Sequence, residues 1–370
     1  MIKAITRVPL NQWYPAAWDN EVPAHREGCT TRPLAVNIAG QMLVLFRTPQ
    51  GIAALHAFCS HQGAALAQGE VLESGCVKCP YHGQTHDANG LSLLSPSCPE
   101  FKLSKLAQVD SYPVIEYAGI VWVYLGDEPK QFPHLLPELA QENFRAVRIE
   151  QHFDAFLREV LKNFVDPAHI AHTHSHSLGD AHHPEVSPYD VTKSADRASA
   201  NFSVSLNPDN PLFPSRKAET QTYFEVDYFA PSVTNAVISN ANGEFQLIIF
   251  AAHTPLGDGT TQTRFVLLRN FGLTAEYDGR VSKRLQQVVK EDAEMLAYQQ
   301  ISLIAQPYYT QADEMPRVTA LIFESFCKEA NLSQHVIGAL GALPVVAAPS
   351  PVRNCNPVLK KCWEARTQAV

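Results

Sequence analysis

The chain has 370 residues, of which 45% are hydrophobic and 18% are charged, so it can bury one large core or two moderate ones. This composition excludes disorder as the main state. The 29 Lys and Arg residues against 37 Asp and Glu residues give a net charge of −8, which argues against nucleic acid as a partner, because a grip on phosphates needs a basic surface.

Neither the start nor the end of the sequence predicts a membrane segment. Residues 1–14 lack the uninterrupted apolar run of a secretory signal. The apolar stretch 336–348 is too short to cross about 30 Å of hydrocarbon, and it contains Pro344. We therefore expect a cytoplasmic protein without a membrane span, whose eight cysteines are reduced and available for metal binding rather than joined in disulfides.

Short alternating segments dominate residues 32–125, and each is broken by Gly, Asn or Pro. This pattern predicts a small antiparallel β domain. The following residues, 126–145, are rich in proline and charge, which is typical of a boundary. We expect the first domain to cover residues 1–148 and the second to cover residues 149–370.

The second domain is predicted to mix helices and strands. Apolar residues from Phe153 to Val165 recur at the spacing of one helical face, so a helix opens this domain. Further helices are predicted over about 279–303 and 318–328. Alternation predicts strands between the first two helices, at residues 202–206, 220–228, 245–251 and 263–268. The predicted fold class is therefore α+β.

Two short motifs in the β domain each offer one thiolate and one imidazole. The first contains Cys59 and His61, the second contains Cys79 and His82, and seventeen residues separate them. Two thiolates and two imidazoles are the ligand set of a [2Fe–2S] cluster with two Cys on one iron and two His on the other. A zinc site uses the same atoms but usually pairs Cys with Cys and His with His, so mixed motifs favour iron and sulfur.

A histidine-rich segment follows the first predicted helix of the second domain. His169 and His174, with a distant carboxylate, would form the facial triad that binds non-haem Fe(II) and leaves positions open for O₂ and substrate. Pro167 interrupts the helix, so the spacing alone leaves open whether His172 or His176 takes the place of His174.

The third ligand is sought on the late helix. Asp292 falls on the same face as Leu285 and Val289, inside the apolar stripe, whereas Glu291 and Glu294 fall off it. An unpaired charge turned into a core costs several kcal/mol, so Asp292 needs a cation or a metal as its partner. The alternative is a helix that tolerates an aspartate at the edge of a narrow stripe.

The two constellations together resemble the Rieske non-haem iron oxygenases, in the single-component branch that includes vanillate O-demethylase. The pattern N-x-x-D-x-x-H-x4-H is present as Asn163, Asp166, His169 and His174, and a late Glu-Asp pair ends in Asp292. The cluster motifs lack the two additional cysteines of the high-potential respiratory branch. The resemblance implies an all-β Rieske domain followed by a helix-grip antiparallel sheet with helices.

The resemblance also implies the cofactors and partners. A [2Fe–2S] cluster and a mononuclear Fe(II) would use O₂ to hydroxylate or oxidatively demethylate a small organic substrate, with electrons from NAD(P)H through a reductase and possibly a ferredoxin. His169, His174 and Asp292 would bind the mononuclear iron. In a homotrimer, Asp166 would bridge to His82 of the neighbouring subunit.

The resemblance bears on three further residues near these sites, and a fourth, Cys76, lies near the cluster motifs but outside them. Asn163, three residues before the bridging aspartate, would support the iron site without binding the metal. Near the cluster, two residues depart from the family pattern, because Gln84 stands where tryptophan is usual and His86 stands where an aromatic residue is common. Cys76 is expected to be a buried thiol rather than a ligand.

Two other functions stay open at this point. In an electron carrier, the cluster would be present and the second domain would bind a ligand without chemistry. A zinc-stabilised interaction module would contain neither iron centre. A second iron at Asp292 separates the oxygenase from both alternatives.

Overall fold

The computed structural model describes residues 8–9, 11–24, 30–100, 107–126, 129, 132, 136–207, 221–299 and 308–329. The chain divides into two compact units, the first formed mainly by residues up to 132 and the second mainly by residues 133–331. The predicted boundary between residues 148 and 149 falls within a strand of the second unit, and the exact domain limits stay a prediction.

The first unit consists of short antiparallel strands. They form three sheets, with the orders β1-β11-β10, β2-β3-β4-β9 and β5-β6-β7-β8. The strands are β1 (Trp13–Trp18), β2 (Leu34–Ile38), β3 (Gln41–Thr48), β4 (Gly51–His56), β5 (Glu70–Val71), β6 (Val77–Lys78), β7 (Thr85–His86), β8 (Ser92–Leu94), β9 (Ser111–Tyr112), β10 (Val114–Tyr117) and β11 (Ile120–Tyr124). The predicted all-β first domain is confirmed.

The hydrophobic core of this unit reaches the two cysteines of the cluster motifs. Cys59 and Cys79 pack in one cluster of buried side chains with Leu55, Leu66 and Val77. Both cysteines lie just beyond a strand, Cys59 after β4 and Cys79 after β6. The packed sheets therefore hold the starting point of each motif in place.

The second unit is built on one antiparallel sheet of seven strands, with the order β12-β18-β17-β16-β15-β14-β13. The strands are β12 (Arg145–Phe153), β13 (Val191–Lys193), β14 (Arg197–Ser205), β15 (Gln221–Phe229), β16 (Val233–Ser239), β17 (Gln246–Pro255) and β18 (Thr261–Arg269). The helices are α1 (Leu157–Phe164), α2 (Ile170–Thr173), α3 (Ala275–Tyr298) and α4 (Glu314–Glu329). The predicted α+β class and the antiparallel sheet with helices are confirmed.

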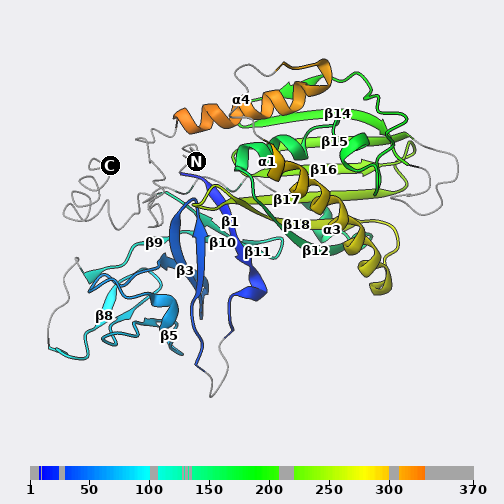
Figure 1. Cartoon of the computed structure of the whole chain (residues 1–370). Helices are drawn as coiled ribbons and strands as arrows, with labels where there is room; N and C mark the ends of the chain where they lie inside the picture. Colours follow the sequence, from blue (N-terminus) through cyan, green and yellow to red (C-terminus); the bar gives the residue numbers. More distant parts are fainter. Residues whose placement is uncertain are drawn as a thin grey trace. The chain divides into compact units, whose positions relative to one another are not determined.

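Helices cover one face of this sheet. Figure 1 shows α1 and α3 lying across it, with α3 packed along β12, while α4 runs along β13 and β14. Side chains of α1 and α3 therefore point at the same sheet face from two different parts of the sequence. Among the helices that the structure describes, none combines the length and the apolar character of a transmembrane span.

The predicted opening helix of the second unit begins later than its apolar spacing indicated. Phe153 is the last residue of β12 and pairs with Thr261 of β18, and the helix begins at Leu157. The prediction was wrong here because apolar residues at positions 149 and 153 satisfy both a strand that alternates and a helix that repeats every four residues. Pairing with β18 makes Phe153 part of a strand rather than of the helix.

Two further differences concern element limits and number. Helix α3 begins at Ala275, earlier than predicted, and it ends at Tyr298 because Gln299 has an extended backbone. The predicted end at residue 303 was too late. The sequence also gave no prediction for β16, whose Asn235 and small residues weaken its alternation. The helix predicted at 318–328 is confirmed as α4.

Candidate metal centres

Each of the two cluster motifs in the first unit forms a turn of the same kind. The backbone N–H of Gly63 donates to the carbonyl of Cys59 at 3.0 Å, and the N–H of Gly83 donates to the carbonyl of Cys79 at 3.1 Å. Both glycines have φ of +71°, a backbone region that side chains disfavour. Each motif therefore needs a glycine four residues after its cysteine to close its turn.

The four candidate ligands sort into an inner and an outer pair. Cys59 and Cys79 are buried, whereas His61 is exposed and His82 is half-buried. The rings of His61 and His82 lie with their centroids 4.6 Å apart. Burial, with a further contribution from the adjacent Cys79, raises the pKa of the Cys59 thiol to about 11.

This donor set fits a mixed-ligand [2Fe–2S] cluster. The Cys59 thiol, kept protonated by burial, becomes a thiolate when a metal replaces its proton, so metal binding and deprotonation are coupled. The arrangement places the thiolate end inside the unit and the imidazole end at its surface. Electrons would therefore reach the cluster from the imidazole side.

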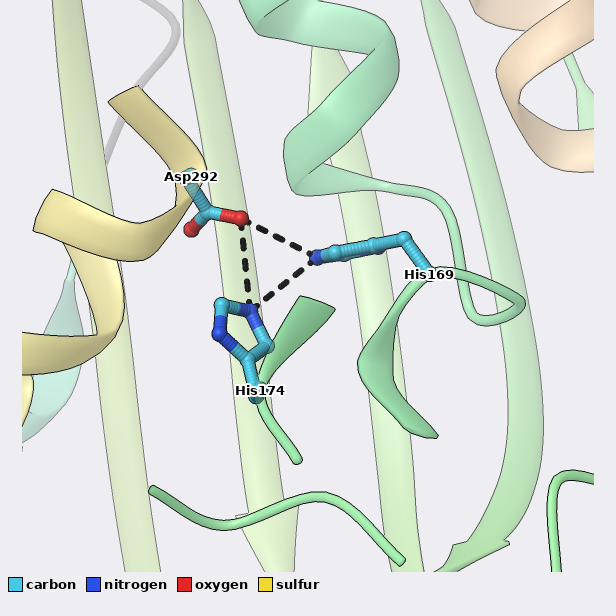
Figure 2. Close-up of side chains that lie close together, drawn as sticks. All are labelled: His169, His174 and Asp292. Carbon is cyan, nitrogen blue, oxygen red and sulfur yellow. Dashed lines mark hydrogen bonds and ion pairs between the residues drawn. The ribbon is translucent and has the colours of Figure 1, made fainter. Parts of the chain in front are cut away.

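The second unit brings three further ligand groups together, as Figure 2 shows. The Nε2 atoms of His169 and His174 each lie 3.3 Å from Oδ1 of Asp292, and they lie 3.2 Å from one another. Ligand atoms held about 2.1 Å from one ion at right angles are separated by about 3 Å. The three side chains therefore fit a single metal ion bound by two histidines and one carboxylate.

Two helices position these ligands. His169 immediately precedes α2 and His174 immediately follows it, so one short turn of helix sets both imidazoles on the same side. Asp292 lies on the inner face of α3, where its exposed fraction is only 2%. The side chain of Asp292 is therefore buried, as its position on the apolar stripe predicted.

The histidines that the sequence left open lie elsewhere. His172 and His176 are both exposed, while His174 is 3% exposed and belongs to the group of three. The chain does leave helical geometry beyond Pro167, but the short helix α2 restores the spacing that His174 needs.

Hydrogen bonds around the group orient its ligands. Asn163 donates from Nδ2 to Oδ1 of Asp292 at 2.9 Å, which agrees with its expected supporting position. Asp166 accepts the N–H of Ala168 on its carboxylate at 2.8 Å, and its backbone carbonyl lies 2.7 Å from Nδ1 of His169. When one imidazole nitrogen donates its N–H to an oxygen atom, the other nitrogen is left without a proton and can bind a metal.

Glu291 is the residue that sequence reasoning missed. Its Oε2 lies 2.9 Å from Nδ1 of His174 and accepts a hydrogen bond from Ser177 at 2.6 Å, while Gln287 donates to Oε1 at 2.9 Å. The carboxylate side chain is 11% exposed although it falls off the apolar stripe. A metal-binding histidine commonly donates the N–H of its other ring nitrogen to a carboxylate, which holds the ring in its orientation. The position of Glu291 directly before Asp292 in the sequence was the signal that could have pointed to this role.

The electrostatics of the group require a positive charge at its centre. Burial alone would lower the pKa of His169, but Asp292 and Asp166 outweigh burial and raise this pKa to about 9. Burial raises the pKa of Asp292, yet the two histidines hold it well below its ordinary value. Without metal, a proton on His169 takes the place of the cation, so the site suits a positive ion.

A cavity opens beside the three ligands. It contains about 880 Å³ of space not filled by protein atoms, including a part open to solvent. Its described walls are mostly apolar side chains of the sheet and of α3, such as Phe202, Phe224, Phe265 and Leu285. A small organic molecule in this cavity would lie beside the metal group.

Comparison with known proteins places both halves of the chain. Residues 12–113 match the Rieske [2Fe-2S] domain, and residues 153–320 match the vanillate O-demethylase oxygenase C-terminal domain. The toluene-4-sulfonate monooxygenase system iron-sulfur subunit of Comamonas testosteroni is 31% identical over 46% of this chain and 47% of that protein. Methylxanthine N1-demethylase of Pseudomonas putida is 24% identical over 72% of this chain and 74% of that protein.

The chain spans about half the length of the first of these relatives. Among solved structures, dicamba monooxygenase bound to dicamba superposes with a TM-score of 0.74 at 22% identity, covering 88% of this chain and 99% of that one, which shows a shared fold. The two family matches follow one another and together cover most of the chain. The chain therefore belongs to the Rieske non-haem iron oxygenases.

Proposed function

We propose that this chain is the oxygenase component of a system that hydroxylates or oxidatively demethylates a small organic substrate. One observation carries the proposal: three ligand atoms converge within 3.2–3.3 Å of one another on the wall of a largely apolar cavity. A ferrous ion with free coordination positions, supplied with single electrons by a cluster, activates O₂ for attack on organic molecules.

The chain's own residues then have separate tasks. Cys59, Cys79, His61 and His82 would hold the cluster, and the group formed by His169, His174 and Asp292 would hold the iron. The apolar cavity walls would exclude bulk water and place the substrate beside the iron. Asn163 and Glu291 would keep their partner ligands oriented.

Electron supply is the second part of the proposal. NAD(P)H would reduce the cluster through a separate reductase, with or without a ferredoxin, in the cytoplasm. In a homotrimer, Asp166 would bridge between His169 and His82 of a neighbouring copy of this chain. The side chain of Asp166 supports this role, because it lies 4.0 Å from Nδ1 of His169 and remains 24% exposed, so its carboxylate is accessible to a second hydrogen-bond donor.

The substrate class follows from the cavity and from the relatives. Apolar and aromatic walls favour a small molecule with an apolar or ring-shaped body. The names of the relatives include a dicamba O-demethylase and methylxanthine demethylases, which act on small aromatic or heterocyclic compounds. We infer that the substrate here belongs to the same size class.

The decisive experiment is anaerobic reconstitution followed by metal and sulfide analysis. The proposal predicts about three irons and about two acid-labile sulfides per chain. NAD(P)H-dependent oxygen consumption with an added reductase should then rise in the presence of a substrate from an aromatic panel. Two irons with two sulfides, and no second iron site, would instead support an electron carrier with a ligand-binding second domain.

A further inference from the structure

A third histidine contacts the candidate cluster site without belonging to the ligand motifs. His86 lies in β7 with no exposed surface, and its Nε2 lies 3.4 Å from Sγ of Cys59. Its other ring nitrogen, Nδ1, lies 3.0 Å from Oγ of Ser92 in the neighbouring strand β8. The ring therefore connects a proposed iron ligand to the sheet.

Ser92 is itself held by two neighbours. Its hydroxyl contacts the backbone carbonyl of Ala107, and it accepts a hydrogen bond from Nε2 of Gln84 at 3.0 Å. Pairing of β7 with β8 sets His86 opposite Ser92. The ring cannot turn away from Cys59 without breaking the contact between Nδ1 and Ser92, so its direction is set by the sheet.

The chemistry of an iron-bound cysteine decides what His86 does. A thiolate ligand carries no proton and can only accept a hydrogen bond. The ring nitrogen that faces Sγ must therefore carry a proton, since two lone pairs facing one another in a buried site would repel. The Ser92 hydroxyl has a single rotatable proton, which can be donated either to the Ala107 carbonyl or to Nδ1. Because Ser60 also donates to that carbonyl, at 2.7 Å, the Ser92 proton can be given to Nδ1 of a neutral ring, whose own proton then lies on Nε2.

We propose that His86 donates its Nε2–H to Sγ of Cys59 and so raises the reduction potential of the cluster. This inference rests on the proposed cluster. Reduction adds negative charge that is shared between the irons and their sulfur ligands, and a hydrogen-bond donor stabilises the reduced form more than the oxidised form. Because Cys59 is only 3% exposed, water does not screen the interaction.

His86 is thus a positioning residue that acts through Cys59. It occupies the place where an aromatic residue is common in similar loops, and a phenylalanine there would fill the space without offering a donor. With His86 at this position, the cluster should therefore have a higher reduction potential than a cluster in an otherwise identical loop that carries an apolar ring there.

The test is a potentiometric titration of the reconstituted cluster, followed by the EPR signal of its reduced form, in His86→Phe and His86→Gln. We expect His86→Phe to retain the iron and sulfide content but to have a lower midpoint potential. His86→Gln, which offers an amide N–H from a similar distance, should recover part of the shift. Equal potentials in wild type and His86→Phe, or a higher potential in the variant, would overturn the inference.

A second variant covers the case in which phenylalanine prevents cluster assembly. Ser92→Ala keeps the imidazole and its volume but removes the group that orients it, so the potential should fall by a smaller amount in the same direction. An unchanged potential in Ser92→Ala with a retained cluster would also count against the inference. All these readings are made without substrate, and a wild-type protein that assembles no cluster would contradict the proposed function instead.

Discussion

The two candidate metal centres differ in how far along the chain their ligands lie. The cluster site takes all four ligands from residues 59–82, in two turns of the same geometry. The mononuclear site combines His169 and His174 with Asp292, which lies on α3. This helix follows the last strand of the sheet in the sequence. Local spacing therefore encodes the first site, whereas packing of α3 against the sheet creates the second.

Their exposure differs in the same sense. The imidazoles of the cluster site lie at the surface of the first unit or near it, while His174 and Asp292 of the mononuclear site are almost fully buried. A surface position suits exchange of electrons with a partner, and a buried position suits chemistry from which water must be excluded. One chain can therefore provide two iron centres with environments that suit different tasks.

The largest effect is expected from a substitution that disrupts the cluster site alone. Cys79→Ala should reduce the iron content from about three to about one per chain and remove the labile sulfide, because a cluster with three ligands does not persist. The mononuclear iron should remain, since its ligands lie in the other unit. Metal analysis and the visible spectrum measure this. Cys76→Ser, outside the motif, is the matched control and should retain the full cluster.

The converse change breaks the mononuclear site. Asp292→Ala should reduce the iron content from about three to about two per chain and abolish turnover, while the cluster spectrum stays intact. Glu294→Gln, on the exposed side of the same helix, should behave as wild type. If Asp292→Ala retained all its iron, the three-ligand site would be wrong.

A smaller effect is expected from the residue behind His174. Glu291→Gln removes the negative charge from Nδ1 of His174 and should weaken binding of the mononuclear iron by about 10- to 100-fold. A competition titration with an Fe(II) chelator measures the affinity. Loss of affinity to the same extent in Glu294→Gln would show that helix charge, rather than the contact with His174, is responsible.

The smallest effect concerns stability in acid. His253 is fully buried between Thr234 and Thr263, and burial lowers its pKa to about 3, below its ordinary value of 6.5. A neutral buried histidine contributes stability that is complete above pH 6.5 and is lost as the pH falls toward 3, by up to about 1.4 kcal/mol per pH unit.

His253→Gln should therefore make the free energy of unfolding fall less steeply between pH 6 and pH 4. Urea unfolding of the second unit at several pH values measures the slope. The exposed His152 provides the control, because His152→Gln should leave the slope unchanged. A slope in His253→Gln equal to that of wild type would mean that His253 takes up its proton without unfolding.

Several features could be predicted from the sequence because they depend on neighbours along the chain. The cysteine and histidine motifs predicted a set of cluster ligands, and the alternating segments predicted the all-β unit. The position of Asp292 followed from a helical period of 3.6 residues, which places an apolar stripe without knowledge of the partner. The same period was misleading at Phe153, where pairing with Thr261 of β18 determines a strand.

What the sequence by itself determined is therefore the identity of the ligand types and the secondary structure that carries them, since both depend on spacing over a few residues. Only the tertiary structure decided that His174, and not His172 or His176, faces Asp292, and that Glu291 supports it. It also brought His86 against Cys59. These contacts join residues 27 to 118 positions apart in the sequence, and residues so far apart meet only when sheets and helices pack.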